Sequence, residues 1–208
     1  MTLVPAKIIA ISDDLIPEID PIFIGLKAEL PENEIVHFTN SNEGLRYVLD
    51  NLNQKMVVLL DINFSSRTEK SGYEVFDDIR KKTSLVYIIM ATVRNLSEIP
   101  LANLVSWINN DAVSLENTFN YPKIISLIKD AIHKLDVQVD SVIEEWIMRH
   151  PPSKRTTALI KTKDGKSYSM DDILSAIRQR EPIGLEFEKN LLKLAIDIFS
   201  RQKLSTDD

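Results

Sequence analysis

The sequence predicts an α/β protein: a doubly wound, five-stranded parallel sheet followed by a small, mainly helical unit that contains a β-hairpin. Two short apolar runs, residues 7–12 and 56–62, are rich in β-branched residues and too short for most helices. Such runs are typical of central strands in a parallel sheet that is covered on both faces. Strand patterns also alternate with helical patterns over residues 5–135, as the crossovers between parallel strands require.

The elements of the sheet follow in a regular order. The strand patterns fall at residues 7–12, 34–39, 56–62, 85–92 and 112–115. The helical patterns between and after them fall at residues 15–30, 41–52, 72–82, 97–107 and 120–135. Pro17 and Pro21 restrict where the first helix can begin, and Ser41 is expected to cap the second.

The remaining chain has a different pattern, so we expect a larger α/β unit at 1–136 and a small α+β interaction domain at 137–208. Residues 139–150 have helical spacing, with Val139, Val142, Ile143 and Trp146 on one apolar face. Residues 151–155 predict a polar turn. A Lys-Asp-Gly turn at 163–165 predicts a hairpin between 157–162 and 166–168. Ser169 and Asp172 form a capping pattern before one helix, and a final helix is expected at 183–203.

Composition narrows the range of functions. The chain has 208 residues and no cysteine, which excludes disulfides, thiolate zinc sites and cysteine nucleophiles. Neither a secretory signal nor an apolar run of membrane-spanning length is visible, so we expect a cytoplasmic protein that makes no membrane contact. Residues 149–208 carry a net charge of +3 and residues 1–148 one of −9, which supports two units with different surfaces.

Three carboxylates follow the two central strand patterns. Asp13 and Asp14 come after the first strand, and Asp61 ends the third. If these strands are adjacent and parallel, the three carboxylates meet at the carboxyl edge of the sheet, where α/β folds bind ligands. Clustered carboxylates repel one another unless a cation lies among them, so the pattern predicts a Mg²⁺ site; solvated strand-end carboxylates are the alternative.

Residues 5–135 resemble the receiver domain of bacterial response regulators. The resemblance lies in Ser12-Asp13-Asp14, Leu59-Leu60-Asp61-Ile62-Asn63, Gly72-Tyr73-Glu74-Val75 and Met90-Ala91-Thr92. It implies that Asp61 accepts a phosphoryl group from a histidine kinase in two-component signalling. It also implies that Asp14, Asp13 and the carbonyl of Asn63 help to hold Mg²⁺, and that Thr92 is the switch hydroxyl.

Two departures from that family predict a degenerate pseudo-receiver. The family has a lysine just after the fifth strand, where this chain has Asn117-Thr118-Phe119. An amide offers a neutral dipole in place of the charge that holds phosphoryl oxygens. The loop at 64–71 is also longer than the family's and lacks proline, although Arg67 or Lys70 within it could supply the missing cation.

The final helix carries apolar residues around most of its circumference. One side has Phe187, Leu191, Leu194 and Ile198; the other has the candidate partner-binding residues Leu185, Leu192, Ile196 and Phe199. Such a helix must be buried on more than one side. We expect it to dock on the receiver-like unit, on a second copy in a homodimer, or on another protein; the alternative is that it forms the centre of the small domain.

The sequence is compatible with three functions to different degrees. The first is a signalling adaptor that binds another protein through a degenerate receiver. The second is a phosphorylation-dependent transcription regulator with phosphoacceptor Asp61 and a C-terminal winged helix. The C-terminal unit has no helix dense in Arg, Asn and Gln that could contact base edges, so DNA is the weaker expectation as a partner. The third, an enzyme, is disfavoured because the chain has only five glycines, no glycine-rich phosphate loop and no convincing Ser/His/Asp set.

Overall fold

The computed structural model confirms the predicted fold class. It describes residues 4–93, 96–109, 113–117, 120–136, 138–162 and 164–203. The predicted positions 112, 118, 119 and 163 lie outside these residues, as does the side chain of Val139. The parallel strands are β1 (Lys7–Ile11), β2 (Ile35–Phe38), β3 (Met56–Asp61), β4 (Tyr87–Thr92) and β5 (Val113–Asn117). They pair in the order β2-β1-β3-β4-β5, so the two central strands of the sequence prediction are neighbours.

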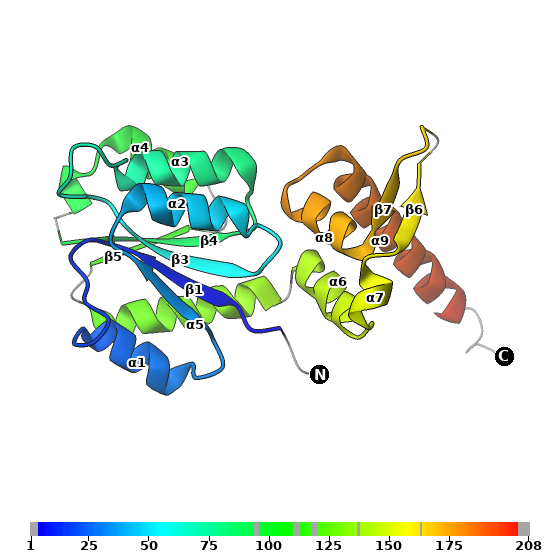
Figure 1. Cartoon of the computed structure of the whole chain (residues 1–208), viewed down its shortest axis with the longest axis horizontal. Coiled ribbons are helices and arrows are strands. Elements are labelled where there is room, and N and C mark those ends of the chain that lie inside the picture. The colour runs from blue at the N-terminus through cyan, green and yellow to red at the C-terminus, as the bar shows by residue number, and fades with distance from the viewer. Residues whose placement is uncertain are drawn as a thin grey trace.

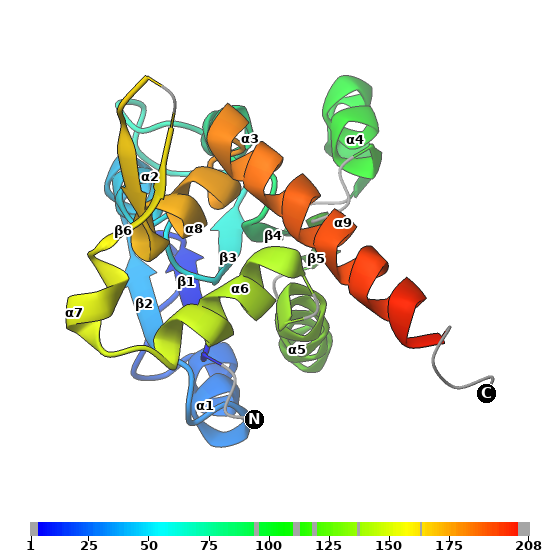
Figure 2. The same ribbon diagram turned by 90° about the vertical axis from the view of Figure 1, so that its right-hand side faces the viewer.

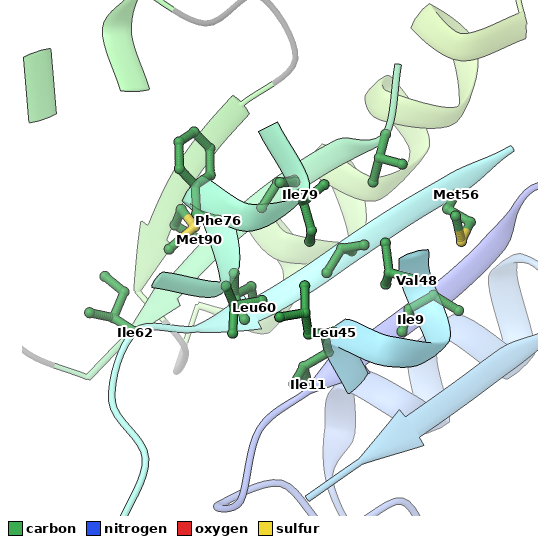
Figure 3. Packing of buried hydrophobic residues seen from close by; sticks show 14 of the residues in the cluster. Ile9, Ile11, Leu45, Val48, Met56, Leu60, Ile62, Phe76, Ile79 and Met90 are labelled. Atoms are coloured by element: carbon green, nitrogen blue, oxygen red, sulfur yellow. The ribbon is translucent and has the colours of Figure 1, made fainter. Parts of the chain in front are cut away.

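Helices cover both faces of this sheet (Figure 1). They are α1 (Pro21–Glu29), α2 (Ser41–Asp50), α3 (Gly72–Lys82), the 3-10 helix η1 (Leu96–Glu98), α4 (Leu101–Ile108) and α5 (Tyr121–Asp136). Alternate residues of each strand face opposite sides, so two apolar cores form. Helices α1 and α5 pack on one face, and α2, α3 and α4 pack on the other. In the second core, Ile9, Ile11 and Leu60 of the strands lie against Leu45 and Val48 of α2 (Figure 3).

Local sequence explains most boundaries and corrects two expectations. Helix α1 begins at Pro21, where a fixed φ is favourable and the missing N–H costs nothing. The cap of α2 is Asn40 rather than Ser41, because the Asn40 side chain accepts hydrogen bonds from the backbone N–H groups of Asn42 and Glu43. The fourth helical pattern is divided into η1 and α4, since Pro100 precedes α4 and cannot continue a helix.

The C-terminal residues form the predicted helices and hairpin. The elements are α6 (Val139–Met148), α7 (Pro152–Arg155), β6 (Ala158–Lys161), β7 (Ser167–Ser169), α8 (Met170–Arg178) and α9 (Pro182–Lys203). Gly165 in the hairpin turn has φ +87°, as the Asp-Gly pattern requires. Ser169 and Asp172 form the predicted capping box. The turn at 151–155 is in fact a short helix, since Pro152 stands at its first position.

The buried face of α6 differs from the prediction. Val142 and Trp146, expected to be inward, are 57% and 42% exposed. Ile143 is buried as expected, and the other buried residues of α6 are Asp140, Ser141, Glu144, Glu145 and Ile147. Carboxylates can take the inward positions because a cation from α8 lies between them: Arg178 Nε donates to Asp140 Oδ2 at 3.0 Å, and Arg178 Nη2 donates to Glu144 Oε2 at 3.0 Å.

The same arginine joins the C-terminal elements to the sheet. Its Nη1 donates to the backbone carbonyl of Asn53, and Thr83 Oγ1 donates to the Arg178 carbonyl at 2.6 Å. Asn53 and Thr83 precede β3 and β4, so this contact lies at the amino edge of the sheet, at the opposite end of the strands from Asp61. A second, partly buried pair, Lys55 Nζ to Asp136 Oδ1 at 2.6 Å, holds the end of α5 at that edge.

None of the described helices is both long enough and apolar enough to cross a membrane.

Candidate functional site

The three predicted carboxylates meet at the carboxyl edge of the sheet. β1 and β3 are parallel neighbours with Ile11 opposite Leu60, so the residues after β1 lie beside the last residue of β3. One carboxylate oxygen from each of Asp13, Asp14 and Asp61 lies within 4.8 Å of the others. Asp61 is buried, Asp13 is half-buried and Asp14 is exposed, so the cluster opens to solvent on one side.

Asp61 is held in place by two hydrogen bonds. Ser12 Oγ donates to its Oδ2 at 3.2 Å, and the backbone N–H of Asn63 donates to its Oδ1 at 3.1 Å. Burial raises the pKa of Asp61, and the negative charges of Asp14 and Asp13 raise it further, while the two hydrogen bonds oppose the rise. Among the residues that the structure describes, no cation forms an ion pair with this carboxylate.

Asp13 gives a direct test of whether the cluster suits a cation. The backbone N–H of Ser65 donates to Asp13 Oδ2 at 2.7 Å. Within the described part of the chain, the other oxygen, Oδ1, is buried and has no hydrogen-bond partner. A buried carboxylate oxygen without a donor is costly unless a cation contacts it. Three carboxylates with an unsatisfied oxygen among them are a donor set suited to Mg²⁺.

Thr92 and Asn63 lie at the same edge of the sheet. Thr92 is the buried last residue of β4, the strand next to β3, and its register partner is Asn117 at the end of β5. Asn63 lies two residues after the end of β3, and its backbone N–H donates to Asp61. The topology thus brings all five residues of the predicted site, Asp13, Asp14, Asp61, Asn63 and Thr92, to one edge of the sheet.

The loop after Asp61 is pinned to its neighbours. Ser41 Oγ donates to the Lys70 carbonyl at 2.7 Å, and the backbone N–H of Ser41 donates to Glu69 Oε2 at 2.9 Å. The Lys70 ammonium pairs with Asp78 on α3, so it is engaged on α3. Gly72 closes the loop, since a Cβ there would lie 2.1 Å from the Asp61 carbonyl oxygen. The sequence predicts Arg67 or Lys70 as the replacement cation. Of these, Lys70 is paired with Asp78, and Arg67 is exposed to solvent.

No protein-family model and no curated protein sequence matches the chain. Among solved structures, the response regulator domain of Thermotoga maritima CheB is 17% identical, with a TM-score of 0.47, and the match covers 65% of this chain and 99% of that one. A response regulator receiver domain protein from Clostridium thermocellum is 25% identical, with a TM-score of 0.47, over 62% of this chain and 95% of that one. At TM-scores below 0.5 these likenesses add no argument. The fold assignment depends on the strand order and register of this chain.

The candidate partner-binding residues lie on α9, far along the chain from the acidic cluster. Leu185, Leu192, Ile196 and Phe199 are 39%, 47%, 66% and 68% exposed. Only the start of α9 is packed: Gly184 is buried against α8, and Ile183 and Phe187 contact the small core of this unit. Helix α9 is thus not the centre of its unit, and its C-terminal half projects beyond the other elements (Figure 2).

Sequence reasoning missed two features of the molecule. The sequence pattern assigns no role to Ser12, although its hydroxyl donates a hydrogen bond to Asp61. The Arg178 network was also missed, because burial of Asp140 and Glu144 depends on a cation 34 or more residues away in sequence. The available signal was the i, i+4 spacing of Asp140 and Glu144, which places both carboxylates on one face of α6.

Proposed function

We propose that this protein is a receiver-like signalling adaptor: a protein-binding module with an intact acidic pocket and a degenerate phosphotransfer site. The support is the contrast between the carboxylate cluster and the end of β5. The carboxylates resemble those of a receiver domain, whereas the end of β5 beside Thr92 carries Asn117 where that family has lysine.

In this proposal, Asp13, Asp14 and Asp61 hold Mg²⁺ with help from the Asn63 carbonyl. A bound Mg²⁺ would offset the charge of the carboxylates and of any phosphoryl group brought to Asp61. Ser12 and the Asn63 N–H hold the Asp61 carboxylate in a fixed orientation. Without the family's lysine, the oxygens of such a phosphoryl group would meet a neutral amide, so the acyl phosphate on Asp61 would be poorly stabilised.

The adaptor part of the proposal is supported by how the C-terminal elements attach. The Arg178 network fixes them at the amino edge of the sheet and leaves the carboxyl edge, with its acidic pocket, uncovered by them. Large apolar side chains are exposed on α9 and on α4, where Leu101 and Ile108 are 75% and 81% exposed. Exposed apolar surface on this scale is typical of protein-binding faces.

Intact-mass measurement tests the loss of phosphotransfer. Wild type and Asp61→Asn are incubated with acetyl phosphate and Mg²⁺, and both are expected to keep their unmodified mass. An adduct of phosphate mass on wild type alone would show a live phosphoacceptor and would defeat the proposal.

The DNA-binding alternative has less support. Helix α7, which precedes the hairpin, has four residues, and α8, which follows it, turns Ile173, Leu174 and Ile177 into the small core. Neither arrangement offers a helix of useful length for the major groove beside a basic wing. Binding of labelled duplex DNA at low salt tests this alternative, because non-specific electrostatic binding is strongest there. Tight binding under those conditions would favour the transcription regulator.

A further inference from the structure

His37 lies behind the acidic pocket, on the strand next to β1. It belongs to β2, where its register partner is Ala10, two residues before Ser12. Its ring Nε2 lies 2.9 Å from the carbonyl oxygen of Ser12. A carbonyl oxygen can only accept a hydrogen bond, so Nε2 carries a hydrogen and donates it. The half-buried His37 ring packs edge to face on Phe23 with ring centroids 5.4 Å apart, which limits its rotation.

Ser12 is held to β2 through both of its peptide groups. Its backbone N–H donates to the Phe38 carbonyl at 3.0 Å, and its own carbonyl accepts the hydrogen bond from His37. The first bond continues the pairing of β1 with β2, whereas the second exists only because residue 37 offers a ring N–H. A peptide group is planar, so a fixed Ser12 carbonyl also fixes the plane that continues to the Cα atom of Asp13.

The side chain of Ser12 links two residues of the acidic pocket. Its hydroxyl donates to Asp61 Oδ2 at 3.2 Å and accepts from the backbone N–H of Asp14 at 3.3 Å. Ser12 is only 3% exposed, so water has little access to these bonds. A displacement of Ser12 would therefore move Asp61 and the start of the loop after β1 together.

We propose that His37 is a positioning residue for the cation site: it fixes the Ser12–Asp13 peptide so that the three carboxylates stay within reach of one ion. This role rests on the proposed Mg²⁺ site and adds to it a residue that is not a ligand. Ligands bind a metal more tightly when other groups hold them in place. The N–H of Ser65 holds Asp13 Oδ2 from the other side, so Oδ1, which has no hydrogen-bond partner among the described residues, is left for the ion.

A purely structural role for His37 predicts a different result. If the ring only satisfied the Ser12 carbonyl, its loss would lower the free energy of unfolding and leave the Mg²⁺ affinity of the folded protein unchanged. A positioning role requires the affinity itself to fall, because part of the binding free energy is then used to order the ligands.

Titration of the ¹⁵N-labelled full chain with MgCl₂, followed by NMR, separates the two roles. The metal-free spectrum shows whether each variant is folded, and the amide shifts of Asp14 and Asn63 give the dissociation constant. His37→Leu removes the ring donor and should raise the dissociation constant about tenfold. His37→Asn, whose amide is too short to reach Ser12, should do the same with a polar side chain.

Two variants are expected to keep the affinity. His37→Gln places an amide N–H near the position of Nε2 and should stay within about threefold of wild type. His133→Leu removes an exposed histidine in the last turn of α5 and should have no effect.

A double variant tests whether His37 acts through Ser12. Because the two residues belong to one chain of contacts, Ser12→Ala/His37→Leu should weaken binding by less than the product of the two single effects. Independent effects, an affinity that His37→Leu and His37→Asn leave unchanged, or an equal loss in His37→Gln would overturn the role of His37 and leave the cation site standing. A wild-type spectrum that does not change with MgCl₂ would overturn the cation site and this role together.

Discussion

Nη2 of Arg178 on α8 lies 3.0 Å from Oε2 of Glu144 on α6, and neither side chain is more than 3% exposed. Asp140 shares the guanidinium, and the Asn53 carbonyl accepts a further hydrogen bond from it. One side chain thereby joins α8, α6 and the loop before β3. This ion network has almost no access to water, so removing one partner leaves the others as buried, uncompensated charges. The stability of the folded protein therefore depends strongly on the network being complete.

Replacing Arg178 with methionine should therefore be severely destabilising. The variant keeps the aliphatic bulk but leaves Asp140 and Glu144 buried without a cation, at a cost of about 3–5 kcal/mol. Urea unfolding followed by circular dichroism measures the change. Arg201→Met is the control, since it removes an exposed pair with Asp197 worth under about 1 kcal/mol. Equal losses in the two variants would show that the buried network contributes no more than a surface pair.

Asp61→Asn should stabilise the metal-free protein at neutral pH. Burial, together with the charges of Asp14 and Asp13, raises the pKa of Asp61 in the folded state. The folded protein then holds the Asp61 proton more tightly than the unfolded chain does. The stability gained from protonated Asp61 is present below its unfolded pKa and is lost as pH rises through its folded pKa. Asparagine is uncharged, so the variant does not have the free-energy cost of a buried carboxylate at neutral pH.

The measurement is thermal unfolding of both proteins in EDTA across a pH series. The variant should exceed wild type at pH 7, and the difference should shrink towards about pH 4, near the unperturbed pKa of aspartate. A difference that does not change with pH, or a less stable variant at pH 7, would contradict the assigned environment of Asp61.

Mg²⁺ should stabilise the wild-type protein by binding its folded form. At a free concentration ten times the dissociation constant, the gain is about 1.4 kcal/mol. Asp13→Asn should remove most of this gain, because it replaces one of the three clustered carboxylates and its unsatisfied buried oxygen. Asp171→Asn, an exposed carboxylate on α8, is the control and should retain it. The measurement is the melting temperature of each protein with and without MgCl₂. A wild-type melting temperature that does not change with Mg²⁺ would contradict the cation site.

Gly72→Ala should damage the site through the backbone. The added Cβ would lie 2.1 Å from the Asp61 carbonyl oxygen, and no flexible side chain can move aside to relieve the clash. A loss of about 2–3 kcal/mol is expected, as for other overpacked positions. Gly165→Ala meets no atom within 4 Å and should cost about 1 kcal/mol, through its positive φ alone. Chemical unfolding ranks the two, and the reverse order would contradict the packing described at Gly72.

The sheet could be predicted from sequence because burial on both faces leaves a strong local signal. All six residues of β3 and all six of β4 are buried, and both strands are apolar up to their last residues, Asp61 and Thr92. The acidic cluster followed from the same pattern, since the carboxyl ends of neighbouring parallel strands meet by construction. Strand-end residues of the site could therefore be named before any coordinates were known.

The face of α6 could not be predicted in the same way. Local hydrophobicity favoured Val142 and Trp146 as inward residues, and the structure instead buries Asp140 and Glu144. Only the long-range pairing with Arg178 makes that choice favourable, and the i, i+4 spacing of the two carboxylates does not identify their partner. The pairing of Lys70, in the loop at 64–71, was hidden for a similar reason, because its partner Asp78 belongs to the next helix.

The most direct test of the central claim, an intact acidic pocket beside a lost phosphotransfer site, is intact mass after treatment with acetyl phosphate and Mg²⁺. Wild type, Asn117→Lys and the double variant Asn117→Lys/Asp61→Asn would be compared. The account predicts an adduct of phosphate mass on Asn117→Lys alone, since lysine restores the charge beside Thr92 and Asp61 accepts the group. An adduct on wild type as abundant as that on Asn117→Lys would contradict it.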